Sequence, residues 1–360
     1  MKANRLRWFL LFLLGSAVFQ SLAQQSEADL KLLAEGRAKA ERGDAVAQFN
    51  LGSRYAKGEG VQTNEVEAVK WYRKAAEQDY AKAQYSLGCC YAKGLGVATN
   101  EVEAVKWYRK AAEQNYPRAQ LYLGGCYGLG KGVAKDEVEA VKWCRKAADQ
   151  NLADAQYSLG RCYATGQGVA KDEAEAVKWS RKAAEQNYAV AQYSLGLCYA
   201  TGCGVATNEV EAVKWYRKAA EQNYAQAQFY LGGHYATGNG IEKDEAEAVK
   251  WFRKAAEGGQ VTPFNALNAL AWILATSPNS EIRDGSNAVV FAEKSVTATN
   301  RKTPGDLDTL AAAYAETGQF EKAVSTQQGA IALLQTEAEK KDYKSRLGLF
   351  EVHLPYRAKD

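Results

Sequence analysis

Histidine, methionine and proline are scarce in this chain of 360 residues, which has two histidines, one methionine and five prolines. Because His234 and His353 are the only imidazoles, a metal site built from several histidines is excluded, and we expect neither a metal nor a cofactor. Hydrophobic residues make up 47% of the chain and charged residues 24%, which is the balance of a folded soluble protein. The composition therefore excludes wholesale disorder.

An excess of charge of one sign is also lacking. The formal net charge is +4, and three of the positive charges, Lys2, Arg5 and Arg7, lie in a segment that we expect to be removed, which leaves +1. A protein that binds nucleic acid through its phosphates needs a basic surface. The near-neutral chain therefore gives no electrostatic support for a nucleic-acid partner.

The apolar run at the start of the chain is too short to cross a bilayer. It spans Phe9–Phe19 and precedes the small-x-small sequence Ser21-Leu22-Ala23, whereas a membrane-spanning helix needs about 20 residues. These features predict a signal peptide over residues 1–23, and a periplasmic or secreted protein with no membrane span after cleavage. An uncleaved N-terminal anchor is the alternative. No Asn-x-Ser/Thr sequon occurs, which fits a bacterial source.

A period of 36 residues dominates the rest of the chain. Recurring tryptophans, Leu-Gly pairs and Gly-x-Gly loops all keep this spacing, without insertion or deletion. Six of the eight tryptophans follow this period, namely Trp71, Trp107, Trp143, Trp179, Trp215 and Trp251. The repeats that they define are residues 45–80, 81–116, 117–152, 153–188, 189–224 and 225–260. Such regularity predicts a tandem-repeat protein.

Each repeat reads as two antiparallel helices. In the first helix, Ala83, Leu87 and Tyr91 form one stripe with the spacing of a helix. Gly94 and Gly96 end that helix, because glycine alone enters left-handed conformations cheaply. The second helix begins with the pattern of a capping box, in which an Asn or Asp is followed three residues later by Glu. The capping residues are Asn64, Asn100, Asp136, Asp172, Asn208 and Asp244.

One pair of helices cannot bury both of its apolar stripes, whereas stacked neighbours can. We therefore expect an all-α fold, a right-handed superhelical α-solenoid of stacked helix-turn-helix repeats. Residues 24–44 would supply an N-terminal capping helix, in which Glu35 stands where the later repeats have tryptophan. A charged residue at that place suits the solvent-facing end of an array.

The repeats share the pattern Ala-Gln-x-x-Leu-Gly-x-x-Tyr-x-x-Gly-x-Gly-Val, followed by Glu-Ala-x-x-Trp-Tyr-x-Lys-Ala-Ala-Glu-Gln. This pattern resembles the Sel1-like repeat family, and its six copies cover about 60% of the chain. Such families are similar in fold to tetratricopeptide arrays and act as adaptors or scaffolds in protein complexes. The resemblance implies a scaffold, and together with the predicted signal peptide we expect an exported, non-enzymatic protein that binds a protein or peptide in a concave groove.

Residues 261–360 break the register and form a C-terminal module. Within it, a first helix with Leu270 and a second helix over 288–299 are expected, followed by a closing amphipathic helix and an extended end within 340–356. The pattern between them resembles a tetratricopeptide unit, through Leu307, Leu310, Ala311, Tyr314, Gly318, Ala323 and Ala330.

No catalytic pattern emerges from the sequence. The loop Gly58-Glu59-Gly60 and its equivalents follow a helix, lack the third glycine of a dinucleotide loop and recur in every repeat. No serine stands in a nucleophile-elbow context. We therefore expect a protein that is not an enzyme.

Seven cysteines leave at least one thiol without a partner in the chain. The column Cys90, Cys126, Cys162 and Cys198 occupies one place in consecutive repeats. Stacked repeats lie about 10 Å apart, whereas a disulfide needs Cα atoms within about 7 Å. We interpret the column as small buried apolar groups. A disulfide between Cys126 and Cys144 of the same repeat remains open.

The alternative function is a β-lactam-binding or β-lactam-hydrolysing enzyme. Cysteine-rich Sel1-like proteins described as penicillin-binding β-lactamases have cysteines eight residues apart, which join the second helix of one repeat to the first helix of the next. That resemblance fails here, because every matching pair is an alanine and a glutamine. The pairs are Ala76/Gln84, Ala112/Gln120, Ala148/Gln156, Ala184/Gln192 and Ala220/Gln228.

Positions that vary between the repeats predict the binding surface. They lie two residues before, one before and two after the repeat leucine, on the face that lines the groove of tetratricopeptide arrays, and aromatic rings there offer a large contact area. The candidates are Phe49, Tyr85, Tyr122, Tyr157, Arg161, Tyr193, Leu197, Phe229 and Tyr230. The alternative is that the aromatic column packs against the preceding repeat. Tyr122 and Tyr230 replace small polar residues of sister repeats, which favours binding at these two positions.

Overall fold

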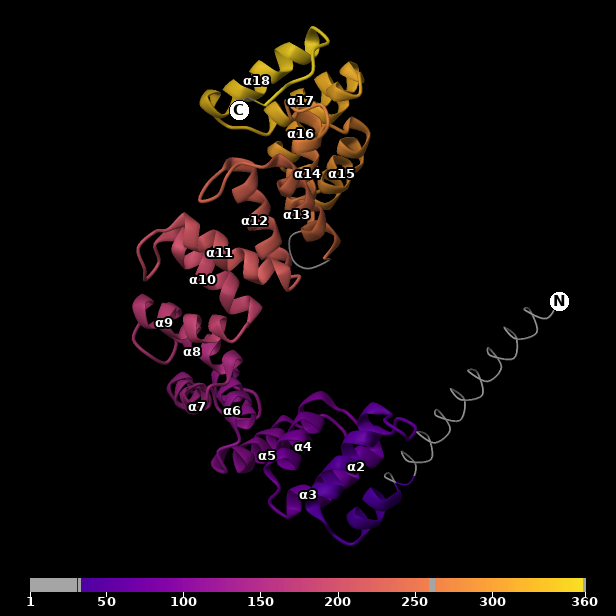
Figure 1. Cartoon of the computed structure of the whole chain (residues 1–360), viewed down its shortest axis with the longest axis vertical. Helices are drawn as coiled ribbons and strands as arrows, with labels where there is room; N and C mark the ends of the chain where they lie inside the picture. The colour runs from indigo at the N-terminus through magenta and orange to yellow at the C-terminus, as the bar shows by residue number, and fades with distance from the viewer. Residues whose placement is uncertain (1–30, 32–33, 259–262, 359–360) are drawn as a thin grey trace, which may run out of the picture. The chain divides into compact units, whose positions relative to one another are not determined.

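The computed structural model describes residues 31, 34–258 and 263–358, and these residues form helices joined by turns and short loops, without a strand (Figure 1). The expected signal peptide, residues 1–23, lies outside the described residues, as does the start of the expected capping helix. Residues 34–41 of that capping helix are helical, and Glu35 is exposed. Among the described residues, no helix combines the length and apolarity needed to span a membrane.

Each repeat contributes a first and a second helix, as the periodicity predicts. They are α2 (Ala45–Lys57) and α3 (Glu65–Glu77), α4 (Ala81–Lys93) and α5 (Glu101–Glu113), α6 (Pro117–Leu129) and α7 (Glu137–Asp149), α8 (Ala153–Thr165) and α9 (Glu173–Glu185), α10 (Ala189–Thr201) and α11 (Glu209–Glu221), and α12 (Ala225–Thr237) and α13 (Glu245–Glu257). The chain divides into two compact units, residues 1–171 and 172–360. Within each unit, a second helix packs against the first helix of the following repeat, so the helix pairs stack as a repeat solenoid.

The second helices are capped at their N-termini by the predicted residues, but the predicted capping boxes are only half formed. The Asn64 side chain accepts a hydrogen bond from the backbone N–H of Glu67 at 3.0 Å. The backbone N–H of Asn64 does not bond to Glu67, because it donates to the carbonyl of Tyr55 at 2.9 Å. The carboxylate of Glu67 is therefore left to pair with Lys70 at 2.6 Å. The cap thus ties the two helices of one repeat together.

In the second to sixth repeats, the second glycine of the Gly-x-Gly loop is required by a close approach between repeats. Gly96 has φ +65°, and a Cβ placed on it would lie 2.1 Å from the carbonyl oxygen of Glu65 in the preceding repeat. No side chain fits there. The loop therefore sits directly on the first turn of the preceding second helix.

A buried glutamine joins each repeat to the one before it. The Gln84 side chain is fully buried, and its Nε2 donates to the carbonyl of Ala76, in α3 of the preceding repeat, at 3.2 Å. Its Oε1 accepts a hydrogen bond from Gln114 Nε2 at 2.8 Å. The same bond to an alanine carbonyl recurs in both units. The other donors are Gln48, Gln120, Gln156, Gln192 and Gln228.

A second connection between repeats runs from an arginine to a tyrosine. Arg73 in α3 donates to the hydroxyl of Tyr91 in α4 at 2.6 Å. In the C-terminal unit, Arg217 donates to Tyr235 at 2.8 Å in the same way. The repeat tyrosines of the second to sixth repeats therefore take part in stacking, which explains why this residue holds from copy to copy.

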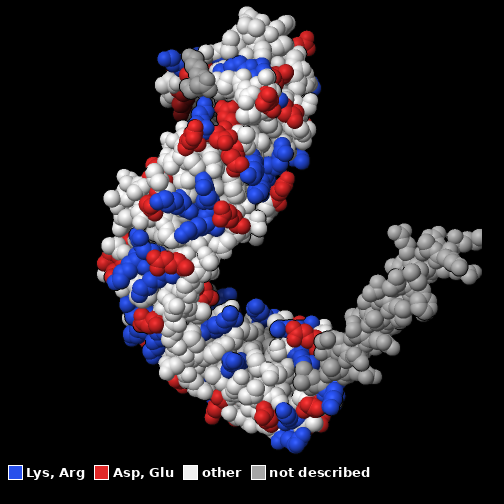
Figure 2. Space-filling model, in the orientation of Figure 1, with Lys and Arg blue, Asp and Glu red and all other residues white. Residues whose placement is uncertain are grey.

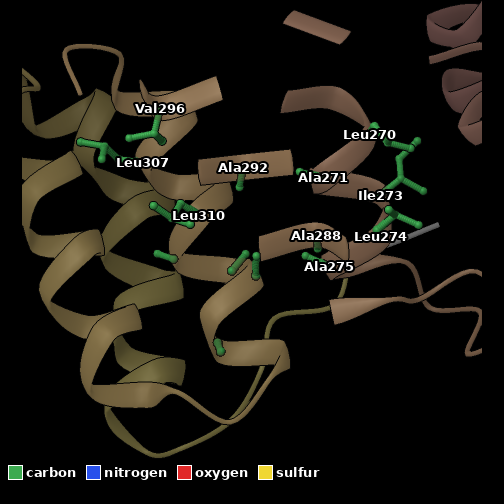
Figure 3. Packing of buried hydrophobic residues seen from close by; sticks show 14 of the residues in the cluster. Leu270, Ala271, Ile273, Leu274, Ala275, Ala288, Ala292, Val296, Leu307 and Leu310 are labelled. Carbon is green, nitrogen blue, oxygen red and sulfur yellow. The ribbon is translucent and has the colours of Figure 1, made fainter. Parts of the chain in front are cut away.

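The C-terminal module consists of α14 (Pro263–Thr276), α15 (Gly285–Ala298), α16 (Pro304–Glu316), α17 (Phe320–Ala332) and α18 (Glu337–Glu351). Leu270 and Leu274 of α14 and Leu307 and Leu310 of α16 contribute to one core, to which α15 adds Ala288, Ala292 and Val296 (Figure 3). The tetratricopeptide-like pattern thus marks the buried face of this module.

Two helices of this module begin three residues earlier than the sequence predicts. The carboxylate of Asp284 accepts from the N–H of Asn287 and caps α15, and Thr336 forms a complete capping box with Glu339 at the start of α18. The extended end returns to the module, where the N–H of Ala358 donates to the carbonyl of Thr276 at 2.8 Å.

All seven cysteines lie within the described residues and none of them forms a disulfide, so the alternative of a disulfide between Cys126 and Cys144 is wrong for this structure. The Cys144 thiol is buried and donates to the carbonyl of Ala155 in α8 at 3.3 Å, which uses it for packing between repeats. Cys90 is buried, and Cys126, Cys162 and Cys198 are half-buried. This agrees with small apolar groups in the stack.

We predict that Gln84→Met lowers the free energy of unfolding by about 1–3 kcal/mol, because the buried carbonyl of Ala76 loses a hydrogen bond and the Nε2 of Gln114 loses its acceptor. Urea denaturation followed by circular dichroism measures the change. The control is Gln62→Met at an exposed loop position, where the expected change is within about 0.5 kcal/mol. Equal stability of the two variants would contradict the role of the glutamine.

A second prediction follows from the free thiols. A reductant should leave the melting temperature of the protein unchanged, because no cross-link constrains the unfolded chain. A disulfide contributes about 2–4 kcal/mol, so its loss would lower the melting temperature by roughly 10 °C. Differential scanning calorimetry with and without reductant distinguishes these outcomes.

Candidate functional site

The first helices carry clusters of tyrosine rings in both units. In the N-terminal unit, the ring centroid of Tyr85 lies 6.0 Å from that of Tyr108, 5.4 Å from that of Tyr116 and 5.4 Å from that of Tyr122. Tyr108 lies in the second helix of the same repeat, Tyr116 is the last residue of that repeat, and Tyr122 lies in the first helix of the next repeat. The cluster therefore spans the junction between two repeats.

The C-terminal unit repeats this arrangement. The ring centroid of Tyr193 lies 6.0 Å from that of Tyr216, 5.3 Å from that of Tyr224 and 5.7 Å from that of Tyr230. Phe229 adds an edge contact to Tyr230 at 5.7 Å. Two sister junctions thus carry the same tyrosine cluster.

The predicted groove residues divide into two classes. Phe49, Tyr85, Tyr157, Tyr193, Leu197 and Phe229 are half-buried. Tyr122 is 41% exposed and Tyr230 37% exposed, and Arg161 is also exposed. The half-buried ring of Phe49 contacts aromatic rings of its own repeat, and those of Tyr85 and Tyr193 contact rings of their own repeat and of the one after it. Contact with solvent is therefore concentrated in Tyr122 and Tyr230.

Burial keeps the cluster hydroxyls protonated. It raises the pKa of Tyr85, Tyr108 and Tyr216 far above that of a free tyrosine, with the nearby thiol of Cys89 adding to the effect at Tyr85 and Tyr108. The Tyr108 hydroxyl donates to Cys89 Sγ at 3.4 Å. Neutral phenols of this kind can hydrogen-bond a ligand and present apolar faces to it, but they do not act as bases near neutral pH.

Five of the seven thiols are also poor nucleophiles. Burial raises the pKa of Cys144 to about 12 and that of Cys90 and Cys198 to about 11, and it also raises the pKa of Cys126 and Cys162. Since the thiolate is the nucleophile, these groups are poorly suited to covalent catalysis. The described residues also contain no cluster of three His, Cys, Asp or Glu that could hold a metal ion.

A cavity in the third repeat was missed by the sequence reasoning. It has a volume of about 510 Å³ and lies between α6, α7 and α8, with Leu121, Gly124, Cys144 and Ser158 among its lining residues. The sequence feature that could have indicated this cavity is one position of the second helix, compared between the six repeats. The residues at this position are Tyr72, Tyr108, Cys144, Ser180, Tyr216 and Phe252.

On the face that Figure 2 shows, charged side chains form no large patch of one sign among the described residues. Basic and acidic side chains are interspersed on this face over both units. Many of them pair within a second helix, as Lys106 does with Glu103 at 3.2 Å. The aromatic clusters and the cavity, rather than charge, distinguish particular places on the surface.

Comparison with known proteins places these features in a family. The family model for the Sel1 repeat matches residues 45–80, 81–116, 117–152, 153–188, 189–224 and 225–260. A comparison with curated proteins finds no match.

Two solved structures are similar to this chain. The protective antigen c5321 of uropathogenic Escherichia coli, described as displaying an SLR fold, is 33% identical with a TM-score of 0.76, over 90% of this chain and 68% of that one. A Sel1 repeat protein from Oxalobacter formigenes is 40% identical with a TM-score of 0.56, over 61% of this chain and 87% of that one. The six matched repeats and these similarities show that the chain belongs to the Sel1 repeat family.

Proposed function

We propose that this protein is an exported bacterial scaffold, not an enzyme, and that it binds a protein or peptide on the face formed by its first helices. That face corresponds to the groove of tetratricopeptide-like arrays. The observation that carries the proposal is the pair of exposed rings, Tyr122 and Tyr230, each at the edge of a tyrosine cluster. Proteins of the Sel1 repeat family generally act as protein-interaction scaffolds, which supports the same function.

The physical argument rests on how the rings are held. Tyr122 contacts the rings of Tyr85 at 5.4 Å and Tyr108 at 5.6 Å, so its orientation is fixed before a partner arrives. A ring that is already ordered loses little conformational entropy on binding and still offers a large apolar face. Tyr230 is held in the same way by Tyr193 and Tyr216.

The alternative function, a β-lactam enzyme, gains no support at the positions where the cysteine-rich Sel1-like proteins have paired cysteines. The cysteine-rich Sel1-like proteins have disulfides at these positions. This chain instead has the hydrogen bonds of the buried glutamines that join consecutive repeats, which we call the glutamine ladder, such as the bond from Gln84 Nε2 to the Ala76 carbonyl. The five thiols whose pKa burial raises are poor nucleophiles. A chromogenic β-lactam incubated with the purified protein tests the alternative, and hydrolysis above the buffer rate would overturn our proposal.

The double variant Tyr122→Ser/Tyr230→Ser tests the binding face. Serine is the residue of sister repeats, as at Ser86, so the fold should persist with a loss of about 1–2 kcal/mol from the aromatic contacts. We expect capture of a partner from the envelope fraction, measured by quantitative mass spectrometry, to fall severalfold.

The matched control is Val102→Ser/Val210→Ser, which changes two exposed apolar residues on second helices instead. This variant should capture the partner as the native protein does. Unchanged capture by the tyrosine variant, with both variants folded by circular dichroism, would move the binding site away from the first helices.

Export is proposed from the sequence of residues 1–23. We expect cleavage after Ala23, which leaves Gln24 as the first residue of the mature protein. Intact-mass measurement of protein recovered from the periplasm or the medium checks the cleavage site. Full-length chain found in the cytosol, with none outside it, would contradict the proposed localisation.

A further inference from the structure

In four of the six repeats, an aromatic ring from the second helix lies on a glycine of the first helix. A Cβ placed on Gly88 would lie 2.7 Å from Tyr108 Cδ1, and a Cβ on Gly232 would lie 2.8 Å from Phe252 Cδ1. Tyr72 on Gly52 and Tyr216 on Gly196 show the same contact. The ring therefore belongs to the packing of most repeats, and it requires a glycine beneath it because a Cβ would clash with it.

The third repeat keeps the glycine but lacks the ring. A Cβ on Gly124 would meet the Ala140 carbonyl at 2.9 Å and the Cys144 backbone nitrogen at 3.4 Å, and its nearest side-chain atom is Cβ of Trp143 at 3.6 Å. Cys144 occupies the position of the ring. The two helices thus approach as closely as elsewhere, while the volume of the ring is left unfilled.

Both neighbours of the missing ring are also reduced in size. Leu121 stands where the sister repeats have Tyr85 and Tyr193, and Ser158 stands where they have Tyr122 and Tyr230. At the junctions that follow the second and fifth repeats, these positions and the ring together form the tyrosine clusters. At the junction that follows the third repeat, they line the cavity of about 510 Å³, a volume within the range of about 300–1,000 Å³ of small-ligand pockets.

The mouth of the cavity is apolar and electrically balanced. Leu129 is 71% exposed there, at a position where the other repeats have Lys or Thr, as at Lys93 and Thr165. Lys135 and Glu137, also at the wall, form an ion pair at 2.7 Å and so compensate each other. An uncharged group enters such a mouth at lower cost than an ion.

We propose that this cavity receives one aromatic side chain of a polypeptide partner, which restores from outside the ring that the third repeat lacks. The proposal rests on the scaffold function argued above and adds the chemistry of one anchor residue. The sister repeats define the occupant, because their glycine, leucine and alanine positions hold a six-membered ring at this place. A ring that enters a preformed apolar pocket is the usual anchor of a protein interface.

The cavity is first tested with p-cresol, which has the shape of a tyrosine side chain. Ligand-observed NMR with the mature full-length protein should detect saturable binding, with a dissociation constant on the order of 1 mM for so small a probe. The variant Cys144→Tyr places the sister residue in the cavity and should weaken binding at least tenfold. No saturable binding to the native protein would overturn the proposal.

A second variant guards against misfolding of the first. Ser158→Tyr fills the cavity from α8, with the residue that Tyr122 and Tyr230 show to be tolerated at this position, and it should also weaken binding at least tenfold. The matched control is Ser86→Tyr, the same substitution at the sister position next to the existing ring of Tyr72. Binding should be unchanged in this control. Equal loss in all three variants would overturn the assignment to the third repeat.

The class of occupant is tested with a random peptide library, selected on the native protein and counter-selected on Cys144→Tyr. We expect the enriched peptides to share one Phe, Tyr or Trp, whose replacement by Ala lowers affinity at least tenfold. If p-cresol binds but no aromatic peptide is enriched, the occupant is a free small molecule, and the polypeptide assignment is wrong. Partner capture by Tyr122→Ser/Tyr230→Ser is independent of this result, so failure of the anchor and failure of the scaffold function remain distinguishable.

Discussion

The buried glutamine that joins consecutive repeats is the constraint on which the stack depends. An amide taken out of water costs free energy unless its donors and acceptor are bonded, and Gln84 meets this condition with the Ala76 carbonyl, Asp79 Oδ1 and Gln114. The bond to Ala76 uses the backbone, so it depends on helix position rather than on a partner side chain. It therefore fixes the spacing of repeats whose other side chains differ.

This spacing explains the small residues on the facing helices. Ala83, Leu87 and Gly88 of α4 are buried, and Gly88 lies so close to α5 that only a flat ring fits over it. The ladder, the glycine and the ring of Tyr108 form a single device for packing one helix pair. In the third repeat, where the ring is missing, the glutamine and the glycine keep their places and a cavity results.

The sequence alone predicts the fold, the repeat boundaries and the helix caps, because each depends on a local pattern that recurs six times. It fails where a backbone group has two available partners. In the expected capping box, the backbone N–H of Asn64 would donate to the glutamate. In the folded repeat, this N–H donates to the Tyr55 carbonyl instead. The cavity was missed for a different reason. The change from Tyr108 to Cys144 is visible in the sequence, but only the structure shows that the ring lies on Gly88.

The cavity stays open because both sides of the third repeat are held by the ladder. Gln120 bonds to the Ala112 carbonyl at 3.1 Å on one side, and Gln156 bonds to the Ala148 carbonyl at 3.3 Å on the other. Collapse of α6 onto α7 is also blocked, because Gly124 already lies against the backbone of Ala140. A core with free side chains relaxes partly into a vacancy, whereas these helices are positioned by backbone contacts that a small residue at Cys144 does not alter. The same hydrogen bonds and backbone contacts that make the repeats uniform thus allow the third repeat to hold a preformed cavity. Substitution at a few ring positions is therefore enough to make the surface of one repeat differ from the others.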